Sequence, residues 1–339
     1  MIGDRTLAAS CRSNHTEPVA PGYDEIVTQA ERRWAALGGA HPSLAPTIAL
    51  QRLLVSEVIA LVERLAETPV ITLPCNAVMA AAKLQRGIPA LRGGPIDVPV
   101  AALAPSLDRF CRYLADWGAG DVARHVLETF ESGRMSRASL LSASLARNQR
   151  AIRMGATQMG LSPDVVWLVG ELATAPLAHL IQARLFGPDE ISGSETLRSA
   201  RAEWDRGYCP ACGSWPVLAE YVDDRRLLRC SFCGIDWEMR SRRCAYCDEN
   251  GAVFTICAAD EKHPERVLEL CDRCGGYTKA VNVAAPTPFL LLALQDLETF
   301  ALDRIAADRG YGRPTLIELG PHATYEPPRP CQEGGVEEG

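Results

Sequence analysis

The chain has 339 residues, of which 47% are hydrophobic and 23% are charged, the balance of a globular protein that can bury a full core. This length favours two or three domains. The formal net charge of −7 argues against a general nucleic-acid binder, because contacts to phosphates need a basic face.

The sequence predicts a cytoplasmic protein without a membrane span. The first 25 residues lack the apolar core of a secretory signal peptide. The most apolar long segment, 165–181, is interrupted by Glu171 and His179 and is too short to cross a bilayer. Because thiols stay reduced in the cytoplasm, clustered cysteines there favour metal binding or redox chemistry over disulfides.

Residues 21–206 are predicted to form a helical domain, after an N-terminus (1–20) that is expected to be disordered. The apolar positions of 50–65 fall on one helical face, and Pro46 stands where that helix is expected to begin. Similar patterns follow at 106–117, 121–130, 137–159 and 163–186. The Gly- and Pro-rich stretch 87–106 interrupts this series. It is interpreted as a spacer in preference to a functional loop.

Between 207 and 283 the apolar pattern changes to that of strands. The runs 216–222 and 225–229 flank two aspartates that favour a turn. The runs 252–258 and 266–270 flank the polar segment 259–265 in the same way. Two hairpins are therefore predicted.

The helical period returns after residue 287, and 285–319 is expected to contain a C-terminal helix. Its predicted buried face consists of Leu290, Leu294, Leu297, Ala301 and Ile305. From 320 to 339 Pro, Glu and Gly dominate, so this tail is expected to be disordered.

Eight of the thirteen cysteines form four Cys-x-x-Cys pairs between 209 and 274. Such a turn places two sulfurs on one side of a tight loop, at the separation that tetrahedral coordination needs. Backbone N–H groups in the turn can stabilise the first thiolate. The residue after the second cysteine often needs a positive φ. The residues at this position are Gly213, Gly234, Asp248 and Gly275.

The pattern favours metal ligands over thiol–disulfide chemistry, because Cys-x-x-Cys oxidoreductases carry one such motif on a βαβ framework. Four turns make two four-cysteine sites, and three pairings are available. Each predicted hairpin returns the chain beside its start and so brings its two flanking turns together. The segment 234–243 has no central turn signal and is predicted to be one outgoing strand. The predicted metal ligands are Cys209, Cys212, Cys230 and Cys233 in one site, and Cys244, Cys247, Cys271 and Cys274 in the other.

Turn, hairpin, turn and outgoing strand occur twice, which predicts two modules, 207–243 and 244–284. Modules of this size bury little core, and a metal held by four cysteines supplies folding free energy of about 10 kcal/mol in comparable zinc modules.

The remaining cysteines and histidines are not predicted to be ligands. Cys257 alternates within a strand and is expected to be buried, with a role as an auxiliary ligand less favoured. The segment 118–123 resembles a dinucleotide fingerprint but follows a helix, so a helix–turn–helix link is predicted. No catalytic or organic-cofactor motif is found, and the chain is expected not to be an enzyme. The other residues considered were Cys11, Cys75, Cys111, Cys331, His125 and His179.

Six arginines lie around the second and third Cys pairs, with aromatic residues between them, and such a group can suit nucleic acid. Interleaved carboxylates would repel phosphate. Two other roles are open: offsetting the charge of roughly −2 on each divalent tetrathiolate, or meeting acidic side chains of a partner. The arginines are Arg225, Arg226, Arg229, Arg240, Arg242 and Arg243.

The segments "GYCPACGSWPVLA", "LLRCSFCGIDWEMRSRRCAYC" and "LELCDRCGGYTKAV", in this order, resemble the formate dehydrogenase accessory proteins of the FdhE type. The helical region before them and "DLETFALDRIAADRGYGRP" after them fit too. The resemblance therefore covers nearly the whole chain except the first twenty residues and the tail. Asp248 stands where the other three turns have Gly, which is a small departure from the pattern of the family.

The resemblance implies an α+β fold with an N-terminal helical domain, two tandem rubredoxin-like or zinc-ribbon-like four-cysteine modules and a C-terminal helix. It implies that the eight paired cysteines hold iron in two mononuclear sites, with zinc as a substitute. It also implies a maturation factor that binds the catalytic subunit of formate dehydrogenase and is required for active enzyme. A thiol- or sulfur-handling redox enzyme acting on that subunit is the alternative, and a nucleic-acid-binding zinc-ribbon protein comes third. The oligomeric state stays open, a homodimer included.

Overall fold

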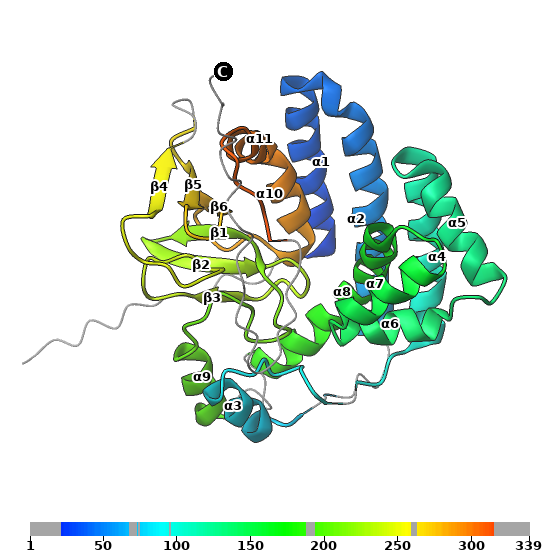
Figure 1. Ribbon diagram of the computed structural model, residues 1–339, viewed down its shortest axis with the longest axis horizontal. Coiled ribbons are helices and arrows are strands. Elements are labelled where there is room, and N and C mark those ends of the chain that lie inside the picture. Colours follow the sequence, from blue (N-terminus) through cyan, green and yellow to red (C-terminus); the bar gives the residue numbers. More distant parts are fainter. Residues whose placement is uncertain are drawn as a thin grey trace, which may run out of the picture.

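The computed structural model describes residues 22–67, 73, 75–94, 96–187, 194–258 and 263–314. The two segments predicted to be disordered, with Cys11 and Cys331, lie outside the described residues. The fold is α+β as predicted, with most helices on one side and a six-stranded sheet on the other (Figure 1).

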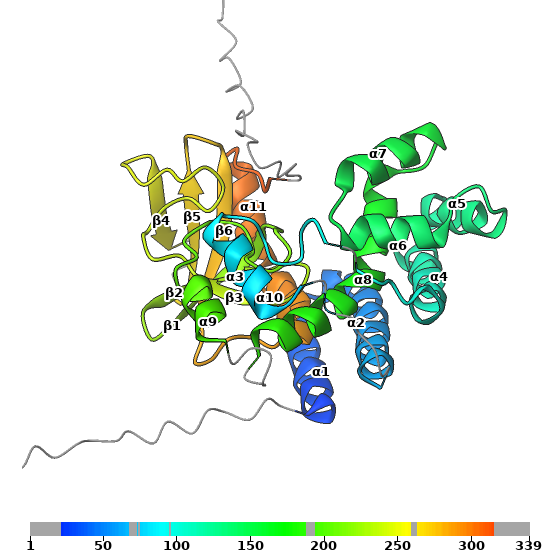
Figure 2. The ribbon, with the colours of Figure 1, turned by 90° about the horizontal axis from the view of Figure 1, so that it is seen from below.

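Helix α8 runs through the middle of the helical part and contacts α2, α4, α6 and α7. Helices α3 and α9, far apart in sequence, lie side by side next to the sheet (Figures 1 and 2). The helices before the sheet are α1 (Tyr23–Ala40), η1 (Pro42–Leu44), α2 (Ala45–Ala66), α3 (Ala77–Gln85), α4 (Val100–Trp117), α5 (Gly120–Glu131), α6 (Arg137–Leu145), α7 (Gln149–Gln158), α8 (Pro163–Phe186) and α9 (Glu195–Ala202).

Two helix boundaries differ from the prediction. Helix α4 begins at Val100 and runs through Pro105, because Leu103 and Leu107 on its inner face are fully buried and hold the first turns in place. The single helix expected over 137–159 is two helices, α6 and α7, separated at Arg147, whose φ is 57°.

The sheet has the strand order β3-β2-β1-β6-β5-β4. Strands β1 to β3 form one antiparallel meander and β4 to β6 form another, which matches the predicted hairpins and repeat. The two meanders join through a parallel pairing of β1 with β6 in which Ala219 faces Ala280. The strands are β1 (Pro216–Val222), β2 (Arg225–Cys230), β3 (Asp236–Glu238), β4 (Phe254–Ala258), β5 (Arg266–Cys271) and β6 (Gly276–Asn282).

The predicted C-terminal helix is broken. The 3-10 turn η2 (Phe289–Leu291) and helix α10 (Leu292–Glu298) are separated from α11 (Phe300–Asp308) at Thr299. Beyond the break the predicted face is wrong: Ala301 is exposed, and Leu302 and Ala306 are buried instead. The break lets the first part pack on α1 and α2 while α11 packs on β5 and β6.

One hydrophobic core runs from the helices into the Cys-rich part. It contains Leu61 and Phe110 of the helical part together with Phe232 and Trp237 of the first module. The sheet therefore does not stand alone against solvent, and the helical part packs against the first module.

Two helices, Pro42–Ala66 and α8, are long and apolar enough by length and composition to cross a membrane, which is weak evidence for a span. The expectation that the apolar segment 165–181 is too short to cross a bilayer is corrected. The segment belongs to α8, which continues to Phe186 and has 24 residues. Half of its most apolar window is buried inside the protein, a property that core helices of globular proteins share.

Candidate metal centres

The eight paired cysteines come together in two groups, and within each group the sulfur atoms lie within 4.8 Å of one another. Each group is made of the two turns that flank one hairpin. The first group is Cys209, Cys212, Cys230 and Cys233, and the second is Cys244, Cys247, Cys271 and Cys274.

The sulfur spacing fits one tetrahedral ion per group. The Sγ–Sγ distances are 3.6 Å for Cys209–Cys233 and 3.4 Å for Cys212–Cys230. In the second group they are 3.7 Å for Cys244–Cys274 and 3.6 Å for Cys247–Cys271. A tetrahedron with metal–sulfur bonds of about 2.3 Å has edges of about 3.8 Å, so each group can accept zinc or iron with small adjustments.

The backbone of the turns has the conformation that the sequence predicts. The residue after each second cysteine has a positive φ, between 61° and 81°. Backbone N–H groups point at the first sulfur: the N–H of Cys212 lies 3.4 Å from the Cys209 sulfur, and that of Cys233 lies 3.3 Å from the Cys230 sulfur. These contacts favour thiolate over thiol and suit metal ligands.

Both groups lie at the same end of the sheet. Cys230, at the end of β2, pairs with Pro216 at the start of β1. Cys271, at the end of β5, pairs with Gly276 at the start of β6. Because β1 and β6 are parallel, their starts lie at one end of the sheet, and the two groups are neighbours there.

Close packing fixes the two groups against each other. A Cβ atom at Gly207 would lie 1.6 Å from the carbonyl oxygen of Ala245, so only glycine lets the third turn approach the segment before the first. The rings of Trp215 and Tyr246 meet edge-to-face at 5.2 Å. Sequence reasoning missed these contacts, because they depend on the pairing of β1 with β6.

The connection 87–106 supports the first group, and the interpretation as a spacer is wrong for its first part. The N–H groups of Ala90 and Leu91 donate to the carbonyls of Pro210 and Ala211, inside the first turn, each at 2.9 Å. The Tyr208 hydroxyl donates to the Gly87 carbonyl at 2.9 Å. The helical part therefore braces a Cys-x-x-Cys turn through backbone hydrogen bonds.

The two groups differ in exposure. All four cysteines of the first group are buried, with at most 2% of any of them exposed. In the second group Cys247 is half-buried and Cys274 is 7% exposed. An ion in the second group would be the more accessible one.

Burial would raise the pKa of Cys212, but hydrogen bonds from the neighbouring thiols outweigh it and lower that pKa well below its ordinary value; at three other ligands burial dominates. Burial raises the pKa of the Cys209 and Cys233 thiols well above the ordinary value, and it raises the pKa of Cys247 to about 12. Without a cation these thiols therefore hold their protons at neutral pH. A metal must displace them, so its binding weakens as the pH falls.

The other cysteines and histidines of the described chain stand apart from the two groups. Cys257 lies on β4 as predicted but is half-buried and packs against the side of α11. Cys75 and Cys111 are buried core residues, and His125 is exposed. His179 is nearest to the first group: its Nδ1 lies 3.0 Å from the Cys233 carbonyl oxygen, and its ring stacks on Phe289.

Five of the six arginines around the Cys pairs have internal partners, and this leaves little of the group free for phosphate. Two of them are buried in ion pairs, one of which joins the two meanders from β2 to β5. The partners are Glu238 for Arg225, Glu269 for Arg226, Glu220 for Arg229, the Ala202 carbonyl for Arg240 and Asp205 for Arg243.

Comparison with solved structures gives a match to the crystal structure of the FdhE protein from Pseudomonas aeruginosa. The TM-score is 0.58 at 24% identity, over 87% of this chain and 95% of that one. The chain has the FdhE fold. Among curated proteins, the "Protein FdhE homolog" of Shewanella baltica is 35% identical over 115 residues, 33% of this chain and 38% of the relative.

"Protein FdhE" of an Escherichia coli O127:H6 strain is 29% identical over 157 residues, 44% of this chain and 45% of the relative. The matches thus span less than half the length of these curated relatives. No family model matches the chain. The resemblance to FdhE-type proteins that the Cys-rich segments predict is confirmed by these relatives and by the fold.

Proposed function

We propose that the chain is an accessory protein of formate dehydrogenase that acts in the cytoplasm. It binds the catalytic subunit of that enzyme and is required for active enzyme, and it has no turnover of its own. The similarity to FdhE proteins in sequence and fold supports this function.

The eight paired cysteines are proposed to hold two metal ions, one in each group. The sulfur spacing, the N–H contacts to sulfur and the positive φ values support this assignment. Spacing does not separate iron from zinc. Iron is proposed as the physiological ion, and aerobic preparations are expected to carry either ion, because zinc binds such sites more tightly than ferrous iron.

The metals are proposed to act by holding a recognition surface in shape. The observation that carries this proposal is the position of both groups at one end of one continuous sheet, where the connection before α4 braces the first of them. Loss of either ion would release two turns that anchor a hairpin.

The first test compares two cysteine variants for binding of the purified catalytic subunit, measured by calorimetry. Cys230→Ser removes a ligand of the first group and should abolish binding, because the hairpin β1–β2 loses its anchor. Cys257→Ser is the matched control on the same sheet outside both groups, and it should bind like the wild type. Normal binding by Cys230→Ser, with its metal lost, would contradict the proposal.

Redox chemistry on the catalytic subunit is the second candidate function. The observation in its favour is the half-buried Cys247, which leaves the second group open to a reactant. An ion or thiol there would exchange electrons or sulfur more readily than one in the first group. No comparable observation favours nucleic acid, since the arginines near the Cys pairs are largely engaged within the protein.

A further inference from the structure

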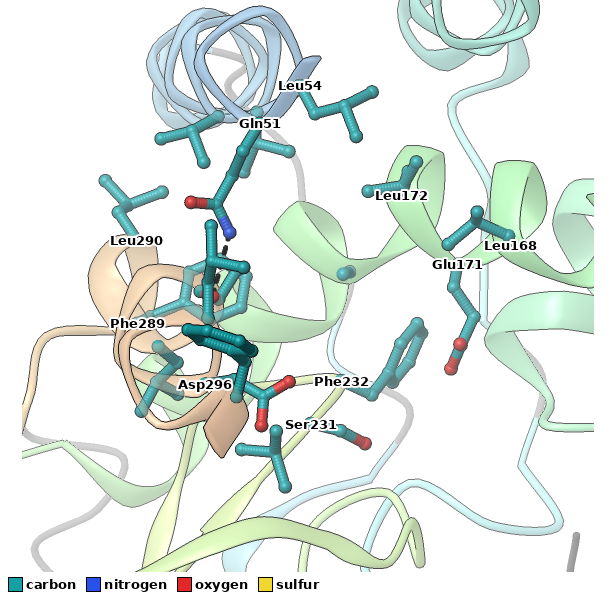
Figure 3. Close-up of a pocket in the computed structure, with 18 of the residues that line it drawn as sticks. Gln51, Leu54, Leu168, Glu171, Leu172, Ser231, Phe232, Phe289, Leu290 and Asp296 are labelled. Carbon is teal, nitrogen blue, oxygen red and sulfur yellow. Dashed lines mark hydrogen bonds between the residues drawn. The ribbon is translucent and has the colours of Figure 1, made fainter. Parts of the chain in front are cut away.

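Two cavities adjoin where the helical part meets the first metal group. The larger has a volume of about 450 Å³ and lies between α2, α8 and α10. Its walls are mostly apolar, and Figure 3 shows Leu54, Leu172 and Phe289 around it, with Glu171 and Ser231 to one side. The smaller has a volume of about 140 Å³ and is polar. Glu171 and Ser231 line both, so the two cavities are neighbours.

The smaller cavity has hydrogen-bond donors without acceptors. Arg92 and Trp215 line it, and the Nε atom of Arg92 and the Nε1 atom of Trp215 are buried without a hydrogen-bond partner among the described residues. The hydroxyl of Ser231, on the same wall, already donates to the Trp215 carbonyl at 3.3 Å. Buried donors are normally paired, so each of these two groups needs an acceptor, which is either a water molecule or a ligand group.

The side chains that line the smaller cavity also carry more positive than negative charge. Glu171 is its one acidic lining residue among those described, and Arg147 Nη1 lies 2.6 Å from Glu171 Oε1. Arg147 is held further by the rings of Trp167 and Phe232, at 4.5 and 4.1 Å. Arg92 has a hydrogen bond to the Ala146 carbonyl and no ion pair with a described carboxylate. Water would satisfy the donors, but a carboxylate would also neutralise this charge.

We propose that these cavities bind an extended segment of the client polypeptide that carries an acidic side chain next to a bulky apolar one. The apolar side chain fills the larger cavity, and the carboxylate accepts hydrogen bonds from Arg92 and Trp215 in the smaller one. This inference rests on the proposed function for the source of the segment. It also explains why the client surface needs the first metal group, since Ser231 and Phe232 of its second turn form part of the walls.

The cavities can be tested without the client. The probes are N-acetyl-Leu-Glu-amide, its uncharged match N-acetyl-Leu-Gln-amide, and free 4-methylpentanoate, each titrated into the metal-loaded full chain. The readout is the NMR signal of the Trp215 indole N–H, which is assigned by its loss in Trp215→Phe. The Glu probe should move this signal downfield and bind about tenfold more tightly than the Gln probe.

Two variants locate the binding. Arg92→Gln should weaken the Glu probe about tenfold and leave the Gln probe unchanged, and Leu168→Ser, in the wall of the larger cavity, should weaken both. Arg112→Gln is the matched control on the exposed side of α4 and should change neither. Equal binding of the Glu and Gln probes would overturn the proposal. The proposal would also be overturned if Arg92→Gln lost metal and no probe bound to the wild type. Arg92 would then only stabilise the nearby thiolates.

Two outcomes separate this inference from the proposed function. If the wild type and Arg92→Gln bind the catalytic subunit equally, the cavities are not the client site and the inference fails while the proposed function stands. If 4-methylpentanoate binds as tightly as the Glu probe, the cavities take free acids and the peptide assignment is overturned. Weaker subunit binding by Arg92→Gln, with metal content unchanged, supports it.

Discussion

Four residues with left-handed backbone close the Cys-x-x-Cys turns, and three of them are glycine. The positive φ is a local requirement of the turn, which is why the sequence predicts it correctly at every position. Asp248 meets the same requirement with a φ of 61°, and its carboxylate lies 3.1 Å from Arg243 Nε. The residues that pack around each turn come from distant parts of the chain, and they differ from one of these glycines to another.

Substitution of two of these glycines separates backbone strain from packing. At Gly275 a Cβ would meet nothing within 4 Å, so Gly275→Ala should cost about 1–2 kcal/mol from the left-handed backbone alone. At Gly234 a Cβ would lie 2.5 Å from the ring of Phe289, so Gly234→Ala should cost clearly more and loosen the first group. Thermal unfolding and metal content would measure both effects. Equal losses in the two variants would show that the contact with Phe289 is unimportant.

Glu57 is a buried carboxylate that ties α2 to α4. It accepts hydrogen bonds from Arg109 Nε and the Ser106 hydroxyl, each at 2.7 Å. Burial alone would raise the pKa of Glu57, but the hydrogen bonds from Arg109, Ser106 and a second arginine outweigh it and lower the pKa.

Glu57→Gln is therefore expected to lower the stability near neutral pH by about 1–3 kcal/mol, less than for a fully buried pair because the arginines are partly exposed. A lowered pKa means that the carboxylate stabilises the fold above the unfolded-state pKa of about 4.3, and this contribution is lost as the pH falls through the folded-state pKa. The difference between variant and wild type in thermal unfolding should thus shrink below about pH 4. A constant difference down to that range would exclude the charge as its cause.

At the scale of elements, hairpins decide which cysteines meet. The sequence predicts this pairing because turn signals and strand runs are local. It does not predict the parallel pairing of β1 with β6, which joins residues far apart in the chain and has no sequence signal of its own. The break at Thr299 is missed for the same reason, since it depends on two surfaces that the helix meets only after folding.

Loss of single ligands tests the grouping of the turns. The wild type should hold two metals per chain when purified without oxygen. Cys233→Ser should lose the metal of the first group and keep most of the second, and Cys244→Ser should show the reverse. A stoichiometry near one in the wild type, or loss of both metals from each variant, would contradict two separate sites. Elemental analysis together with thiol protection against alkylation would measure this.

At the scale of the molecule, the helical part and the metal modules share one core, and the proposed client cavities lie between them. The sequence predicts both parts but not their junction. Arg92 shows why: it belongs to a connection without regular structure, and its position depends on the hydrogen bonds from Ala90 and Leu91 to the first Cys-x-x-Cys turn. Such a contact has no periodicity by which a sequence would reveal it.

The central claim is that the metals act by holding a client surface in shape, and replacement of iron by zinc tests it most directly. Zinc favours the same tetrahedral thiolate geometry but has no redox chemistry. Chains loaded with zinc or with iron would be compared for binding to the catalytic subunit and for restoring formate dehydrogenase activity in an extract without the accessory protein. The account predicts that the two forms bind and restore activity equally. A zinc form that binds equally well but restores no activity would contradict it and assign a redox role to the iron.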